Sequence, residues 1–186
     1  MINIMHIKNI FNHKEIRKNK SYKNAFTLVE IVLYIGLVGI ILLALSSFFT
    51  ILIETRIRNQ VISEIYEQGS QITQIISLSI RNSTSIVSPT TGNTSTTTLS
   101  LNEPTRIKSP TIFTISSSTL NITEGVSSSI LLTSNKVKIS NMSFSNVSLP
   151  STVGSIKFKF TLIYINPDNK QIFNYSETFY GSATVR

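Results

Sequence analysis

Apolar and polar side chains follow three successive patterns along the chain. From Phe26 to Ile53 the residues are almost wholly apolar, and Glu30 is the single charged side chain among them. A helix rises about 1.5 Å per residue, so this run is longer than the roughly 30 Å hydrocarbon core of a bilayer. The run therefore predicts a membrane-spanning helix over residues 26–53.

The helical pattern continues beyond the apolar run. Branched aliphatic side chains recur at four-residue steps, namely Ile57, Val61, Ile65, Ile72, Ile76 and Ile80. Charged and amide side chains occupy the other faces, which predicts an amphipathic extension over residues 54–82. The apolar stripe is typical of a face that packs on the protein's own core, and a coiled coil with a partner is the alternative.

Period-two alternation replaces the helical pattern after residue 83. Apolar side chains alternate with polar ones over 156–164, a turn with Pro167 follows, and Phe173, Tyr175 and Phe179 resume the pattern. We therefore expect a hairpin over 155–181. Further strands are expected at 97–101, 111–116, 118–123, 128–133 and 136–145. A shift of apolar parity near Ser140 and Asn141 indicates a bulge in the last of these.

These patterns together predict an α+β fold. Its long N-terminal helix is transmembrane in the first half and amphipathic in the second, and it packs on a C-terminal antiparallel β-domain. The expected divisions are a leader (1–25), the membrane helix (26–53), its extension (54–82) and the β-rich domain (83–186).

Charge separates the leader from the rest. The chain has 186 residues and a formal net charge of +8, but residues 1–25 hold six basic side chains against Glu15 alone. Basic residues before a spanning helix favour a cytoplasmic N-terminus. We therefore expect a single-pass membrane protein whose β-domain lies outside the cytoplasm.

The composition argues against catalysis. The chain has no Cys, and its two histidines, His6 and His13, both lie in the leader. Without the leader, the chain lacks the commonest general base, the thiol nucleophile and the usual zinc ligands. We expect no enzyme activity, no cofactor and no metal site. The Asn166–Asn169 turn has oxygens of the kind calcium prefers, but a plain turn is the commoner structure.

Four lysines form the densest basic cluster outside the leader: Lys136, Lys138, Lys157 and Lys159. Alternation directs them away from the core. An ordinary solvated face is the expected outcome, and contact with DNA or another anionic surface is the alternative. We expect no aromatic residue beside them.

The carboxylate in the apolar run needs an explanation. A charged side chain at the centre of a bilayer costs about 3 kcal/mol on insertion scales, so Glu30 is expected to have a partner or a role. A plain signal anchor with a stray acid is one alternative. A secretory signal peptide cut near Ala44-Leu45-Ser46 is another, although the apolar run is longer than such peptides have.

The segment Ala25-Phe26-Thr27-Leu28-Val29-Glu30, which follows a basic leader and begins a long apolar helix, resembles the processing motif of type IV prepilins and pseudopilins. The resemblance implies cleavage by a prepilin peptidase between Ala25 and Phe26 and N-methylation of Phe26. It implies that Glu30 pairs with a terminal amine when subunits assemble through their helices. Membrane lipid surrounds the helix before assembly.

The resemblance favours a minor subunit of a pilus-like, secretion or competence filament. The family usually has glycine where this chain has Ala25, and the proline and disulfide-closed loop of many major pilins are missing here. Within the family, a competence pseudopilin that contacts DNA is the alternative. Outside it, the alternative is an anchored adhesin or binding domain that never assembles.

Overall fold

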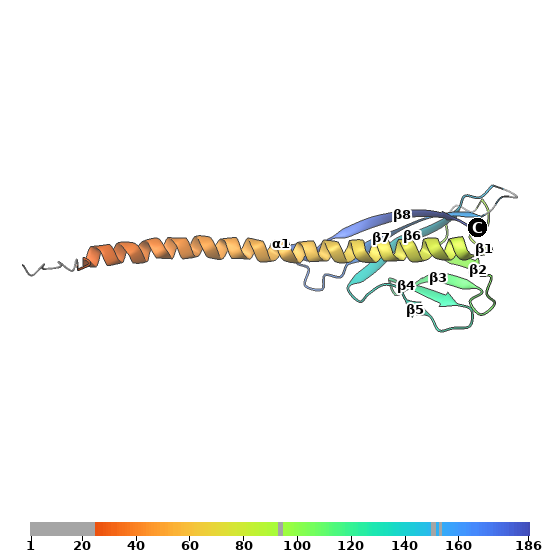
Figure 1. Cartoon of the computed structure of the whole chain (residues 1–186), viewed down its shortest axis with the longest axis horizontal. Coiled ribbons are helices and arrows are strands. Elements are labelled where there is room, and N and C mark those ends of the chain that lie inside the picture. Colours follow the sequence, from red (N-terminus) through yellow and green to blue (C-terminus); the bar gives the residue numbers. More distant parts are fainter. Residues whose placement is uncertain (1–24, 93–94, 150–151, 153) are drawn as a thin grey trace, which may run out of the picture. The chain divides into compact units, whose positions relative to one another are not determined.

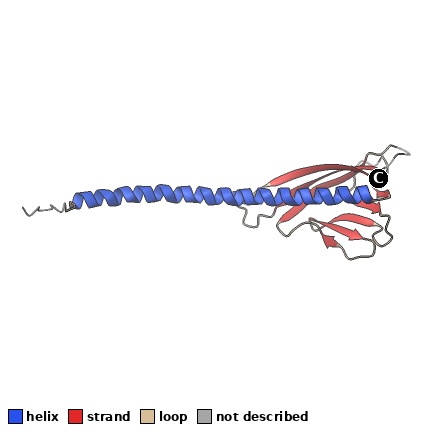
Figure 2. Cartoon of the chain, in the orientation of Figure 1, coloured by secondary structure: helices blue, strands red, loops and turns tan. Residues whose placement is uncertain are grey.

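A computed structural model of the chain describes residues 25–92, 95–149, 152 and 154–186. The expected leader therefore lies outside the described residues, apart from Ala25. The chain divides into two units, residues 1–46 and 47–186. One long helix and antiparallel sheets make up the described fold, which confirms the α+β prediction (Figures 1 and 2).

The helix α1 covers Leu28–Asn82. It begins two residues later than expected, and it ends where expected. At the C-terminal end of α1, the Ser83 hydroxyl donates a hydrogen bond to the carbonyl oxygen of Ile80 at 2.7 Å. This bond satisfies one of the carbonyl groups that every helix leaves without a partner at its end.

The second half of α1 buries the face that the four-residue pattern identified. Its fully buried side chains include Ile65, Ile72, Ile76 and Ile80, and Val61 is almost fully buried. The four isoleucines form one hydrophobic core with side chains of both sheets. The stripe is therefore a packing face of the protein's own domain.

Five short strands form one antiparallel sheet in chain order. They are β1 (Ser85–Ser88), β2 (Leu99–Asn102), β3 (Thr111–Ser116), β4 (Thr119–Glu124) and β5 (Ile130–Leu131). Strands β2 to β4 match expectation closely, β5 is shorter than expected, and β1 was not expected. Its two apolar residues, Ile86 and Val87, are too short a run to predict a strand alone, and β1 pairs with β2.

The second sheet contains β6 (Val137–Asn146), β7 (Ser155–Tyr164) and β8 (Ser176–Thr184), paired in that order. The β6–β7 register shifts between Ser140 and Ser143, and Asn141 has a positive φ of 51°, which confirms the bulge. The hairpin is confirmed, but its second strand starts late. Phe173 lies in the short 3₁₀ helix η1 (Gln171–Phe173), so the prediction that Phe173 and Tyr175 belong to the strand is wrong.

A close approach between α1 and β8 depends on Gly69. The ring of Phe179 occupies the space that a Cβ atom at Gly69 would need. The same ring stacks on Phe160 at a centroid distance of 5.4 Å and meets the edge of Tyr66 at 6.0 Å. The rings of Tyr66, Phe160 and Phe179 therefore pack the helical turn around Gly69 against the three-stranded sheet.

A polar cluster holds α1 against the segment before β6. The Gln68 side chain is buried, donates to Glu64 and to the hydroxyl of Ser134, and accepts the backbone N–H of Ser134 at 3.1 Å. Lys136 forms an ion pair with Glu64 at 3.2 Å. The hydrogen bond from Gln68 is the main cause that lowers the pKa of Glu64, and Lys136 lowers it further, while burial acts in the opposite direction.

Candidate functional site

The residues at the predicted cut site lie just outside the helix. Ala25 and Phe26 are exposed and precede the first residue of α1. Thr27 takes the N-cap position, since its hydroxyl oxygen accepts the backbone N–H of Glu30 at 3.3 Å. Threonine followed three residues later by glutamate is a common signature of a helix start. The Ala25–Phe26 peptide bond therefore precedes the helix.

Glu30 has a local partner in the first turns of α1. Its Oε1 atom accepts a hydrogen bond from the Tyr34 hydroxyl at 3.0 Å. The ring of Tyr34 also meets the ring of Phe26 edge-on, with centroids 6.3 Å apart. Sequence reasoning missed Tyr34, although its position four residues after Glu30 places the two side chains on one face.

The first half of α1 is long and apolar enough to cross a membrane. Among the described residues it is the one helix with this property, and its most apolar stretch has no buried residue. Large side chains such as Leu33, Ile40 and Phe48 are more than half exposed along it. The helix is therefore compatible with a single-pass membrane protein.

The four candidate lysines do not form one cluster. Lys157 and Lys159 lie on the outward face of β7, opposite Ser145 and Ser143 of β6. Lys138 lies on β6 opposite Ile163, further along the sheet. Lys136 precedes β6 and is engaged by Glu64 of α1. The structure thus brings two of the four lysines together.

An exposed aromatic residue stands beside this pair. Tyr180 lies opposite Lys159 on β8 and is 73% exposed. The expectation that no aromatic residue lies beside the lysines is therefore wrong. Tyr180 follows the inward-facing Phe179, so alternation could have placed it on an outward face. Its neighbour Lys159 is known only from the β7–β8 register.

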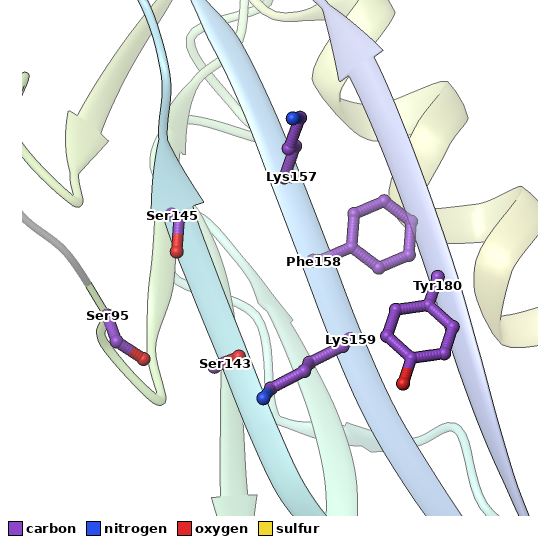
Figure 3. Close-up of a pocket in the computed structure, with 7 residues that line it drawn as sticks. All are labelled: Ser95, Ser143, Ser145, Lys157, Phe158, Lys159 and Tyr180. Carbon is purple, nitrogen blue, oxygen red and sulfur yellow. The ribbon is translucent and has the colours of Figure 1, made fainter.

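A shallow hollow of about 380 Å³ opens on this face of the three-stranded sheet. Lys157, Lys159 and Tyr180 line it together with small hydroxyl side chains (Figure 3). Its lining residues are Ser95, Ser143, Ser145, Lys157, Phe158, Lys159 and Tyr180. We refer to this group as the Tyr180 hollow.

Strand alternation makes the surrounding face polar and free of acids. The outward positions of β6, β7 and β8 carry lysine, serine and threonine, with Ile163 and Tyr180 as the large side chains besides. The acid of β8, Glu177, lies opposite buried Leu162 and accepts a hydrogen bond from the Tyr175 hydroxyl instead. The local charge of the Tyr180 hollow is therefore positive.

The perturbed titratable groups lie elsewhere in the domain. A hydrogen bond with Tyr66 raises the pKa of Tyr175, and burial and Glu177 raise it further. Burial raises the pKa of Glu103, and nearby Glu124 adds to the effect while Lys108 opposes it. None of these residues lines the Tyr180 hollow.

The described residues hold no group of three or more His, Cys, Asp or Glu side chains that would suit a metal ion. In the Asn166–Asn169 turn, the Asn166 side chain bonds to the backbone N–H and carbonyl of Lys170. Asp168 pairs with Lys170 at 3.1 Å. The side-chain oxygen of Asn166 and the carboxylate of Asp168 are therefore both engaged by Lys170, the residue that follows the turn.

No protein-family model, curated protein or solved structure matches the chain.

Proposed function

We propose that this chain is a prepilin-like minor subunit of a pilus, secretion or competence filament. The observation that carries the proposal is the segment Ala25–Glu30, which stands between a basic leader and a long apolar helix. Its small residue and Phe26 precede a capped helix, and the helix presents an exposed apolar surface. A prepilin peptidase would cut between Ala25 and Phe26, and other subunits would then be the partners of the helix.

The geometry around Glu30 suggests how the segment tolerates an acid before assembly. The Tyr34 hydroxyl satisfies one carboxylate oxygen, and a negative charge is favoured in the first turn of a helix. Cleavage before Phe26 creates an α-amine, whose pKa near 8 keeps it cationic at neutral pH. Glu30 then exchanges its local hydrogen bond for an ion pair with the amine of a neighbouring subunit.

A DNA-uptake subunit is the second candidate. Lys157 and Lys159 lie beside the exposed ring of Tyr180, and nucleic-acid sites combine such cations with aromatic surfaces. Since Glu64 engages Lys136, the face holds fewer available cations than the sequence suggests.

The test replaces Glu30 in cells that make this chain. Glu30→Val and Glu30→Gln remove the charge, and we expect both variants to reach the membrane and to be cleaved normally. Their recovery in sheared filament fractions should fall at least about tenfold, because an unpaired buried amine costs a few kcal/mol. The matched control Tyr34→Phe keeps the carboxylate and should still assemble. Recovery of Glu30→Val at the level of the unsubstituted chain would refute the proposed role of Glu30.

A further inference from the structure

The Tyr180 hollow combines three features on a solvated sheet face. It has a positive local charge, one large exposed ring, and a surround of small hydroxyl side chains. Among the ion pairs of the described residues, none uses Lys157 or Lys159, so both ammonium groups face solvent. The charge of this face therefore favours binding of an anionic ligand.

The arrangement of Lys157 and Lys159 limits the size of that ligand. They are two positions apart along β7, which places their Cα atoms roughly 6.6 Å apart on one face. Figure 3 shows the Tyr180 ring on the neighbouring strand beside Lys159, with Ser143 and Ser145 on the other side of β7. A volume of about 380 Å³ is at the small end for ligand pockets, so it suits a few rings rather than a long polymer wrapped around the domain.

The single ring points to a sugar rather than to a run of bases. Sites for single-stranded nucleic acid use a cationic groove that follows the backbone and several rings that stack successive bases. On this face Tyr180 is the sole aromatic among the outward positions of β6–β8, and Lys138 lies further along the sheet. A flat ring also suits the C–H face of a pyranose, because the π-face carries partial negative charge. Serine hydroxyls match the hydroxyl groups of a sugar.

We propose that the Tyr180 hollow binds an acidic glycan, with a hexuronate ring stacked on Tyr180 and carboxylates at Lys157 and Lys159. This inference does not depend on cleavage or filament assembly, since the hollow lies wholly within the 47–186 unit. It assigns a ligand class to the β-domain, whether the chain is a filament subunit or an anchored binding protein.

The experiment uses the full chain in detergent micelles and measures binding of a trigalacturonate probe by calorimetry. We expect binding that weakens with salt, and at least about tenfold weaker binding of the neutral trimer maltotriose. Tyr180→Ala should lower the affinity about tenfold, whereas Tyr180→Phe should keep most of it. The double variant Lys157→Gln/Lys159→Gln should lose most of the binding.

Matched controls distinguish binding at the Tyr180 hollow from nonspecific attraction of the anionic probe to positive charge. The double variant Lys138→Gln/Lys170→Gln removes the same formal charge from positions outside the hollow, so it should bind like the unsubstituted chain. Circular dichroism verifies that each variant remains folded. No binding of trigalacturonate at low salt would overturn the proposal, as would loss of binding in the control double variant. Tighter binding of a thymidine oligonucleotide than of trigalacturonate would overturn it in favour of nucleic acid.

Discussion

One added methyl group at Gly69 tests the packing of α1 on the three-stranded sheet. Gly69→Ala in a helix gains about 1 kcal/mol of intrinsic helix propensity. Here the new Cβ atom would overlap the ring of Phe179, which Phe160 and Tyr66 hold in place. Overpacking of this kind costs about 3 kcal/mol at the upper end of its usual range. We therefore expect a net loss of about 2 kcal/mol in the free energy of unfolding.

The effect of Gly69→Ala on the free energy of unfolding should change sign once the Phe179 ring is removed. In a Phe179→Ala background the added methyl group meets no ring, so Gly69→Ala should stabilise that variant by about 1 kcal/mol. Chemical denaturation of the full chain in micelles, followed by circular dichroism, gives all four free energies of the cycle. Gly39→Ala is a matched control, because nothing lies within 4 Å of its added Cβ atom. If Gly69→Ala stabilises the unsubstituted chain by about 1 kcal/mol, the described contact between Gly69 and Phe179 does not exist.

Two further predictions concern the polar cluster and the cut site. The pKa of Glu64 is lowered in the folded chain from its ordinary value of 4.5, so Glu64 stabilises the fold above that pH. Glu64→Gln should therefore lower the free energy of unfolding at pH 7, and the difference should disappear as the pH falls below 4.5 toward the lowered pKa; a constant difference down to pH 2 would contradict the assignment. Ala25→Leu should block cleavage while Ala25→Gly is cleaved at least as well, as judged by electrophoretic mobility, and an identical short product from Ala25→Leu would place the cut elsewhere.

Local periodicity was sufficient to predict the helix and the longest strands. Four-residue steps from Val61 to Ile80 identified the buried face of α1, and alternation in β7 identified its core positions, because both patterns depend on neighbours along the chain. The bulge at Asn141 was predictable for the same reason, as the parity of apolar residues shifts there.

Apart from Tyr34, whose partner Glu30 is four residues away, the features that sequence reasoning missed depend on partners in other elements. Strand β1 pairs with β2, and its Ile86-Val87 dipeptide is too short a run to predict a strand from local sequence. Tyr180 becomes part of a candidate site because the register places it opposite Lys159. Lys136 is no longer a candidate for contact with an anionic surface, because folding brings Glu64 beside it. No window of local sequence contains these relationships.

The mass of the chain extracted from cell membranes tests the central proposal most directly. A prepilin-like subunit should appear without residues 1–25 and with about 14 Da added, since one methyl group replaces a hydrogen on the Phe26 amine. Fragmentation of the N-terminal peptide would place both changes at Phe26. A chain that keeps its leader, or one cut within the apolar run near Ala44, would contradict the proposal.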